Sequence, residues 1–365
     1  MIQQIEIYNF RCYEKNKKFP AFNRVNLIGG KNNAGKTAFL EAMYLSNAPS
    51  PNSIFFLLRL RRENSDFLKA VPEKAWDNFF YHQNNREVVR IISKASEKTL
   101  TLELSSDDSV EEFARIEENI QEDNDLIDMR SLLINRDATR SVLHLNLMIN
   151  GQLQPASSIL ANSKGVIGRE LKAPDIKKVS FIPAAFRLSS SALAEEFDKA
   201  ELNNKAGEVL EALRFVDNSI DQAKTLSIGE PALYLKRKND SFMLISLFGE
   251  AISKVADFTL RLVNNRESIL LIDEIENGFH HTNQHNLWRM LFKLALELDV
   301  QIFATTHSLE MLQAFAEIGQ EKDFEGVGAY FEFARNPKTN QIVGIKRDIE
   351  TLDFSLKRHK EVRGE

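Results

Sequence analysis

Residues 30–37 read G-K-N-N-A-G-K-T, the complete G-x-x-x-x-G-K-[S/T] pattern of a phosphate-binding loop. The preceding residues 24–28 (R-V-N-L-I) predict a buried strand, and residues 38–45 carry helix formers with apolar periodicity. A strand, a glycine-rich loop and a helix in succession let backbone N–H groups turn onto phosphate oxygens. This stretch therefore predicts a nucleoside triphosphate site in an α/β fold.

The side chains of this loop have separate expected roles. Lys36 supplies a point charge for the β and γ phosphates, and Thr37 supplies a hydroxyl for Mg²⁺. The predicted cofactors are therefore ATP and Mg²⁺. The other loop residues expected to bind the nucleotide are Gly30, Asn32, Asn33, Ala34, Gly35 and Ala38.

Two further patterns predict strands that end in reactive side chains. Residues 269–274 (I-L-L-I-D-E) are an apolar run followed by two carboxylates, of which Asp273 is placed to hold Mg²⁺ and Glu274 to polarise the attacking water. Residues 302–308 (I-F-A-T-T-H-S) predict another buried strand, and His307 at its end can stabilise the γ phosphate. The predicted catalytic residues are Glu274 and His307, and the predicted metal ligands are Thr37 and Asp273.

Composition narrows the class of protein. The chain has 365 residues with 43% hydrophobic content and a formal net charge of −5, so it carries no overall basic field for nucleic acid. The single cysteine, Cys12, excludes an intrachain disulfide framework. No apolar run approaches the roughly 18–20 residues of a membrane span, and the N-terminus does not read as a signal peptide. We expect a cytoplasmic protein with no membrane partner.

The order of predicted elements indicates a nucleotide-binding head with an inserted lobe. Residues 2–9 alternate like an amphipathic strand, so the nucleotide-binding sheet is expected to start the chain. The head is assigned to residues 1–48 and 175–365, where alternating helices and strands predict a mixed or parallel sheet flanked by helices. A helical and β lobe is assigned to residues 49–174. Within it, residues 107–128 hold ten acidic residues against one basic residue, which favours a solvated helix or mobile loop.

Together the three motifs resemble those of ABC-class ATPases, in the branch that contains RecF-like proteins, SMC heads and OLD-type (overcoming lysogenization defect) ATPases. L-I-D-E-I-E-N-G-F-H at residues 271–280 and Q-I-F-A-T-T-H-S at residues 301–308 are similar to stand-alone OLD-like AAA ATPases, and I-E-I-Y-N-F-R-C-Y at residues 5–13 fits the same branch. The resemblance implies that Arg11 lies near the nucleotide and that His280 marks the D-loop. About 45 residues follow the last predicted helix, too few for a TOPRIM nuclease domain.

An ABC-class head also implies a signature motif, because two heads enclose ATP and the signature of one completes the site of the other. Residues 246–250 (S-L-F-G-E) precede a long predicted helix whose N-terminal donors would point at a phosphate. We assign the signature to Ser246, Gly249 and Glu250, within a signature-bearing part at about residues 226–265. The alternative, residues 226–230 (L-S-I-G-E), runs into a predicted strand. A Q-loop is not clear, because residues 181–187 contain no glutamine.

The resemblance implies an ATP-hydrolysing switch that forms a homodimer or higher homo-oligomer around ATP-Mg. It would drive conformational change in DNA repair or anti-phage defence, with a separate nuclease or toxin as effector. The alternative is a nucleotide-gated scaffold or sensor with little turnover that holds such an effector. DNA is also considered as a partner because of two basic clusters, Arg59, Arg61, Arg62 and Lys236, Arg237, Lys238. The engine of a membrane transporter fits less well, because the signature is atypical.

Overall fold

The computed structural model describes residues 1–15, 17–19, 21–63, 65–109, 139–155, 157–169, 176–184 and 188–358. Contacts between residues divide the chain into two units, and each is described by itself. Unit 1 consists of Met1–Ala21, Thr37–Ile176 and Asn336–Ile342. Unit 2 consists of Phe22–Lys36, Lys177–Arg335 and Val343–Glu365.

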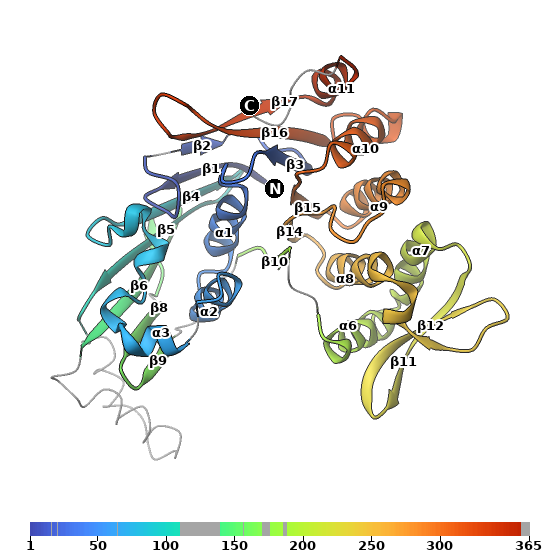
Figure 1. Cartoon of the computed structure of the whole chain (residues 1–365), viewed down its shortest axis with the longest axis horizontal. Helices are drawn as coiled ribbons and strands as arrows, with labels where there is room; N and C mark the ends of the chain where they lie inside the picture. The colour runs from blue at the N-terminus through green and yellow to red at the C-terminus, as the bar shows by residue number, and fades with distance from the viewer. Residues whose placement is uncertain are drawn as a thin grey trace. The chain divides into compact units, whose positions relative to one another are not determined.

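In the described residues, unit 2 is built around a six-stranded sheet with the order β10-β14-β15-β3-β16-β17 (Figure 1). Pairing is parallel from β10 through β16, so these strands end at the same edge of the sheet. Every residue of β3, β14 and β15 is buried, as expected for apolar strands covered on both faces. The strands are β3 (Val25–Gly30), β10 (Val179–Ile182), β14 (Ile269–Ile272), β15 (Gln301–Thr305), β16 (Gly328–Arg335) and β17 (Ile342–Arg347).

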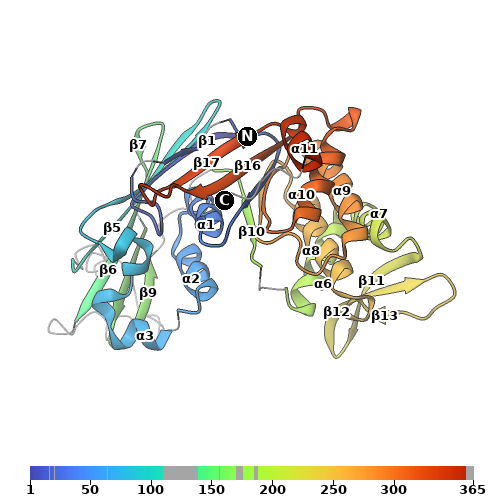
Figure 2. The ribbon, with the colours of Figure 1, turned by 45° about the horizontal axis from the view of Figure 1, so that its top comes forward.

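Helices α8, α9 and α10 lie side by side in unit 2 (Figure 2). The Trp288 side chain joins α9 to α10, because its Nε1 donates to the Met311 carbonyl at 3.1 Å and its ring lies 4.8 Å from that of Phe315. The helices are α6 (Ser190–Leu202), α7 (Ala206–Val216), α8 (Glu250–Asn264), α9 (Gln284–Glu297), α10 (Leu309–Gly319) and α11 (Ile349–Lys357), with 3₁₀ turns η4 (Ile245–Phe248), η5 (His281–Asn283) and η6 (Lys322–Phe324). A three-stranded antiparallel sheet of β11 (Ile220–Ile228), β12 (Glu230–Arg237) and β13 (Met243–Leu244) packs against α6.

Unit 1 contains an antiparallel sheet, which has eight strands in the described part of the chain. Its main path runs β2-β1-β4-β5-β6-β8-β9, and β7 pairs with β6. These strands are β1 (Ile2–Tyr8), β2 (Lys17–Phe19), β4 (Val89–Ala95), β5 (Thr99–Asp107), β6 (Arg140–Ile149), β7 (Gln152–Leu153), β8 (Ser157–Asn162) and β9 (Gly165–Arg169). The helical segments that accompany them are α1 (Lys36–Asn47), α2 (Pro51–Leu60), α3 (Ser65–Ala70), η1 (Pro72–Lys74), η2 (Asp77–Phe79) and η3 (Tyr81–Gln83).

The predicted fold class is confirmed: the chain is α/β, with a parallel-rich sheet flanked by helices and an antiparallel lobe. The expectation that the nucleotide-binding sheet starts the chain is wrong. Strand β1 pairs with β2 and β4 in the antiparallel sheet, where its alternating burial suits a sheet with one covered face. The predicted boundaries of head and lobe stay a prediction. In the predicted acidic segment, residues 110–128 lie outside the described residues.

None of the helices in the described ranges combines the length and the apolar content that a membrane span requires.

We predict that Gly30→Ala destabilises the fold. Gly30 has φ +143°, and a Cβ there would lie 2.2 Å from the carbonyl oxygen of Phe333 on β16. Backbone strain alone is expected to lower the free energy of unfolding by about 1–3 kcal/mol. The matched control is Gly207→Ala in α7, where no atom lies within 4 Å of an added Cβ, so stability should hold or rise slightly. Urea unfolding followed by circular dichroism measures both, and equal stability of the two variants would contradict this account.

Candidate functional site

The strand, loop and helix expected around residues 30–37 are present. Strand β3 ends at Gly30, and α1 begins at Lys36. Between them Asn33 and Gly35 adopt φ values of +63° and +85°, and Ala34 N donates to the Lys31 carbonyl at 3.2 Å. Left-handed residues of this kind allow consecutive N–H groups to point inward, which is the arrangement that binds phosphates.

The Lys36 ammonium is buried, with the residue only 6% exposed. Its Nζ donates to the carbonyl oxygens of Gly30 at 2.7 Å and Lys31 at 3.0 Å, and lies 3.3 Å from Nδ1 of His307. Burial lowers the pKa of Lys36 to about 8, although the carboxylates of Asp273, Glu276 and Glu274 oppose that shift. The loop therefore holds a positive charge that is only weakly stabilised without a bound anion.

Asp273 and Glu274 directly follow strand β14 at the edge of the sheet, and Thr305 at the end of the adjacent β15 contacts both. The Thr305 hydroxyl donates to Asp273 Oδ1 at 2.6 Å and accepts from Glu274 N at 2.9 Å. Glu274 has φ +50°, so the chain turns sharply directly after Asp273. Asp273 is a buried carboxylate fixed by a neutral hydroxyl, which suits a ligand of a hard cation such as Mg²⁺.

The Glu274 carboxylate is oriented by its own turn. Asn277 Nδ2 donates to Glu274 Oε2 at 2.8 Å. The Asn277 carbonyl in turn accepts from Nζ of Lys254 on α8 at 2.6 Å. Asn277 therefore links the predicted base, through these two hydrogen bonds, to the helix that follows the predicted signature.

His307 lies directly beside the buried lysine. Its pKa is lowered first by burial and then by the charge of Lys36, whereas Glu276 raises it, so the imidazole is neutral at pH 7. Because the Lys36 ammonium can only donate, Nδ1 of His307 accepts and Nε2 carries the proton. This tautomer leaves an N–H donor for a phosphate oxygen.

Three residues of the site were not found from the sequence: Thr305, Glu276 and Asn277. Thr305 reaches Asp273 because of the parallel register of β14 and β15, in which Ile272 faces Ala304. Glu276 accepts from His307 N through Oε1 at 2.7 Å. The sequence does contain an indication of Glu276, because the acidic pattern D-E-I-E places a third carboxylate close to the end of the same strand.

The predicted signature has the local structure expected of it. Residues 246–250 span η4, Gly249 at φ +94° and the first residue of α8. Ser246 and Gly249 are exposed, and the Glu250 side chain packs against the backbone of Gly278. The alternative, residues 226–230, forms the turn of the β11–β12 hairpin, and no helix follows it. The nucleotide-binding role of Ser246, Gly249 and Glu250 stays a prediction.

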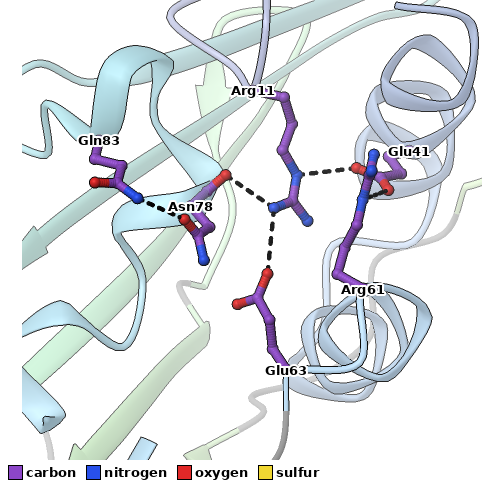
Figure 3. A network of polar contacts seen from close by, with 6 residues as sticks. All are labelled: Arg11, Glu41, Arg61, Glu63, Asn78 and Gln83. Carbon is purple, nitrogen blue, oxygen red and sulfur yellow. Dashed lines mark hydrogen bonds and ion pairs between the residues drawn. The ribbon is translucent and has the colours of Figure 1, made fainter. Parts of the chain in front are cut away.

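Arg11 is held within unit 1 by Glu41 in the middle of α1 and by neighbouring residues (Figure 3). Its Nε donates to Oε2 of the fully buried Glu41 at 2.9 Å, and its Nη1 donates to the Asn78 carbonyl at 2.8 Å. Arg61 Nε donates to the other oxygen of Glu41 at 2.8 Å, and Glu63 lies 3.8 Å from Arg11 Nη1. Arg11 is thus part of a buried ion-pair network, and its predicted place near the nucleotide stays a prediction.

His280 is exposed in the turn before η5, where its Nδ1 lies 3.0 Å from the Thr282 hydroxyl. Its predicted D-loop role stays a prediction. No group of three or more His, Cys, Asp or Glu side chains within the described ranges is arranged to hold a metal ion. Asp273, and Thr37 directly after Lys36 in the chain, are the candidate protein ligands.

The chain was compared with known protein families, and one family model matches most of it. The family model described as "AAA domain, putative AbiEii toxin, Type IV TA system" matches residues 25–312. That range contains the phosphate loop, both strands with catalytic candidates and His307. A protein of Helicobacter pylori named "ATP/GTP phosphatase" is 26% identical over 346 residues, which cover 89% of this chain and 90% of that protein.

Solved structures of SMC heads are also similar to the chain. One is an SMC head bound to the C-terminal winged-helix domain of ScpA, with 10% identity, a TM-score of 0.49 and coverage of 98% of this chain and 99% of that one. Another is the Pyrococcus furiosus SMC head with an extended coiled coil bound to the C-terminal domain of ScpA, with 10% identity, a TM-score of 0.48 and 99% coverage of both chains.

We predict that nucleotide affinity falls at alkaline pH. With its pKa lowered to about 8, Lys36 is charged below that pH and neutral above it, so binding a triphosphate there requires proton uptake. Affinity should be nearly constant up to about pH 7.5 and then fall about tenfold per pH unit beyond 8. Calorimetric titration in two buffers of different ionisation enthalpy measures the uptake.

The control for this prediction is Lys31→Met, which removes an exposed lysine of the same loop and should preserve the pH dependence. Constant affinity between pH 7 and 9.5 in the wild-type protein would contradict the assignment.

Proposed function

The chain belongs to the family described as "AAA domain, putative AbiEii toxin, Type IV TA system", and we propose that it is an ATP-hydrolysing switch that dimerises around ATP-Mg. One observation carries the proposal: the buried Lys36 ammonium lies 3.3 Å from His307, with Asp273, Glu274 and Glu276 acting on its charge. A cation, a neutral imidazole and acidic groups beside a phosphate loop are the parts that phosphoryl transfer to water requires. The enzyme is therefore an NTPase, and GTP is a second candidate substrate because the Helicobacter pylori relative is named for both nucleotides.

The residues divide the reaction among them. Lys36 exchanges its bonds to the Gly30 and Lys31 carbonyls for bonds to the β and γ phosphates. Thr37 and Asp273 would hold Mg²⁺, which would offset the negative charge of the phosphate oxygens. Glu274 accepts a proton from the attacking water as the bond to the γ phosphorus forms and the bond to the bridging oxygen breaks. His307 Nε2–H donates to a γ-phosphate oxygen, and the products are ADP and inorganic phosphate.

The dimer is proposed because the predicted signature is exposed and precedes a helix. Ser246 and Gly249 stand at the N-terminus of the 15-residue helix α8, where backbone donors and the helix dipole favour an anion. In the dimer this surface would close over the phosphate loop of the partner. By the same proposal, exposed His280 faces the partner and Arg11 contributes to the nucleotide site. Higher homo-oligomers built from such dimers are compatible with this contact.

We propose that the switch serves anti-phage defence or DNA repair through a separate effector, a nuclease or toxin. The family description, which names a toxin and a type IV toxin–antitoxin system, supports an effector partner. The alternative is a scaffold or sensor with little turnover that holds the effector. It is favoured by the bond from Asn277 to Glu274, because that bond occupies one of the two oxygens of the predicted base. Turnover measured with and without DNA distinguishes the switch from the scaffold. Strong stimulation by DNA favours a switch in repair, and slow turnover that DNA does not change favours the scaffold.

We predict that Glu274→Gln binds ATP but does not turn it over. The amide keeps the size of the carboxylate but cannot accept the water proton, so kcat should fall by at least about 100-fold. The bound triphosphate should then trap the dimer, which light scattering coupled to size exclusion detects. The control Glu325→Gln changes an exposed glutamate of unit 2 and should hydrolyse ATP normally. Undiminished hydrolysis by Glu274→Gln would refute the role of Glu274 as base.

We predict that two inactive variants complement each other. Lys36→Ala disables the phosphate loop and Ser246→Arg disables the signature. Each composite site combines the loop of one subunit with the signature of the other, so neither homodimer has an intact site. In an equal mixture half of the dimers are mixed and contain one intact site, which should restore about one quarter of wild-type activity. Replacing Lys36→Ala by Lys36→Ala/Ser246→Arg in the mixture is the control and should restore none. Failure of the first mixture to regain activity after subunit exchange would contradict a signature that acts on the partner.

A further inference from the structure

Glu276 is a third carboxylate beside the phosphate loop, and none of the chemical steps described above is assigned to it. Its Oε1 accepts from the backbone N–H of His307 at 2.7 Å. Its Oε2 is buried and has no hydrogen-bond partner within the part of the chain that the structure describes. A buried carboxylate oxygen without a donor is costly, so the position of this side chain requires an explanation.

The backbone around His307 shows what Glu276 provides. Thr306 N still donates to the Ile28 carbonyl of β3 at 3.0 Å, so the sheet ladder continues to that residue. Ser308 N bonds to the Thr306 hydroxyl, and the Ser308 hydroxyl caps α10. Between the sheet ladder and the helix cap, the N–H of His307 donates to the Glu276 carboxylate. Glu276 therefore accepts the hydrogen bond from His307 N that a neighbouring strand would otherwise accept.

The position of Glu276 is itself fixed by the same pair of strand ends. The turn after β14 is fastened to β15 by the Thr305 hydroxyl, which contacts Asp273 and Glu274, and by Ile275 N, which donates to the Thr305 carbonyl at 3.0 Å. These bonds leave little freedom to the residue that follows Ile275. The carboxylate thus reaches His307 from a rigid turn.

We propose that Glu276 is a positioning residue for nucleotide hydrolysis, which holds the backbone of His307 so that its imidazole lies against Lys36 and faces the γ phosphate. This inference rests on the proposed function, since it assigns a role within the same site. Glu276 acts through His307 and does not touch the substrate. The Glu276 carboxylate also opposes, through its charge, the lowering of the Lys36 pKa by burial.

The hydrogen bond and the charge are separable by substitution. Glu276→Gln retains an oxygen that accepts from His307 N but is neutral, whereas Glu276→Ala removes both. We expect Glu276→Gln to keep kcat within about threefold of wild type and Glu276→Ala to lower it about 10- to 100-fold, with little change in KM. The control Glu325→Ala removes an exposed glutamate of unit 2 and should be silent.

A double-mutant cycle tests whether Glu276 acts through His307. Adding Glu276→Ala to His307→Ala should change kcat less than about twofold, because the group that Glu276 positions is already absent. A full additional loss in that background, or a Glu276→Gln variant as defective as Glu276→Ala, would overturn the proposal.

A second measurement does not depend on turnover. Hydrogen exchange of the His307 amide should be slow in the wild type and Glu276→Gln and fast in Glu276→Ala, and unchanged exchange in Glu276→Ala would overturn the proposal. If His307→Ala lowers turnover but Glu276→Ala does not, the role of Glu276 is overturned and the proposed function is not. A wild-type protein without turnover would overturn the proposed function and, with it, this role.

Discussion

The buried ammonium of Lys36 is the constraint on which the rest of the site depends. A charge in a residue that is only 6% exposed must be compensated, and the loop supplies two carbonyl oxygens within 3.0 Å. One of them belongs to Gly30, whose φ of +143° and contact with β16 exclude a side chain at that position. These bonds do not fully compensate the charge, since burial still lowers the pKa of Lys36. A triphosphate supplies the missing negative charge, so this imbalance favours nucleotide binding.

The parallel sheet brings the other groups to that ammonium. Because β14, β15 and β3 are neighbours with the same direction, Asp273, His307 and the phosphate loop leave the sheet at one edge. Backbone bonds still hold the N–H groups of Asp273 and Thr306, whereas those of the next residues, Glu274 and His307, donate to side chains that take over the role of a strand partner. Thr305 does this for Glu274 and also contacts the Asp273 carboxylate, and Glu276 does it for His307. Side chains at or just after the strand ends therefore position the catalytic candidates. If an oxygen of one of these side chains moved, the reacting group that it holds would move as well.

The sequence predicted the parts of this site that are encoded locally. Glycines, a lysine and a threonine at fixed spacing indicate the loop, and apolar runs that end in polar residues indicate β14 and β15. The partners of those residues depend on long-range register, so the contacts of Thr305 and Glu276 could not be read from spacing. The misplaced β1 has a similar cause, because alternation reports one covered face and says nothing of which sheet the strand joins. The pairing of Arg11 with the buried Glu41 likewise joins residues 30 positions apart.

The contacts of Asn277 connect two functions that the proposed dimer assigns to different sites. Within one protomer, Asn277 donates to Glu274 and accepts from Lys254, four residues after the signature glutamate Glu250. Glu250 itself packs against Gly278, where φ of +81° and the close Glu250 side chain both favour glycine. In an ATP-enclosing dimer, Glu274 serves the nucleotide on its own loop, while Glu250 serves the nucleotide of the partner. In the proposed dimer, a change in the bonding of Glu274 during hydrolysis would act on the helix that completes the other site, through the two hydrogen bonds of Asn277 and the contact of Glu250 with Gly278. These contacts would give the two nucleotides of the proposed dimer a direct physical path for coupling.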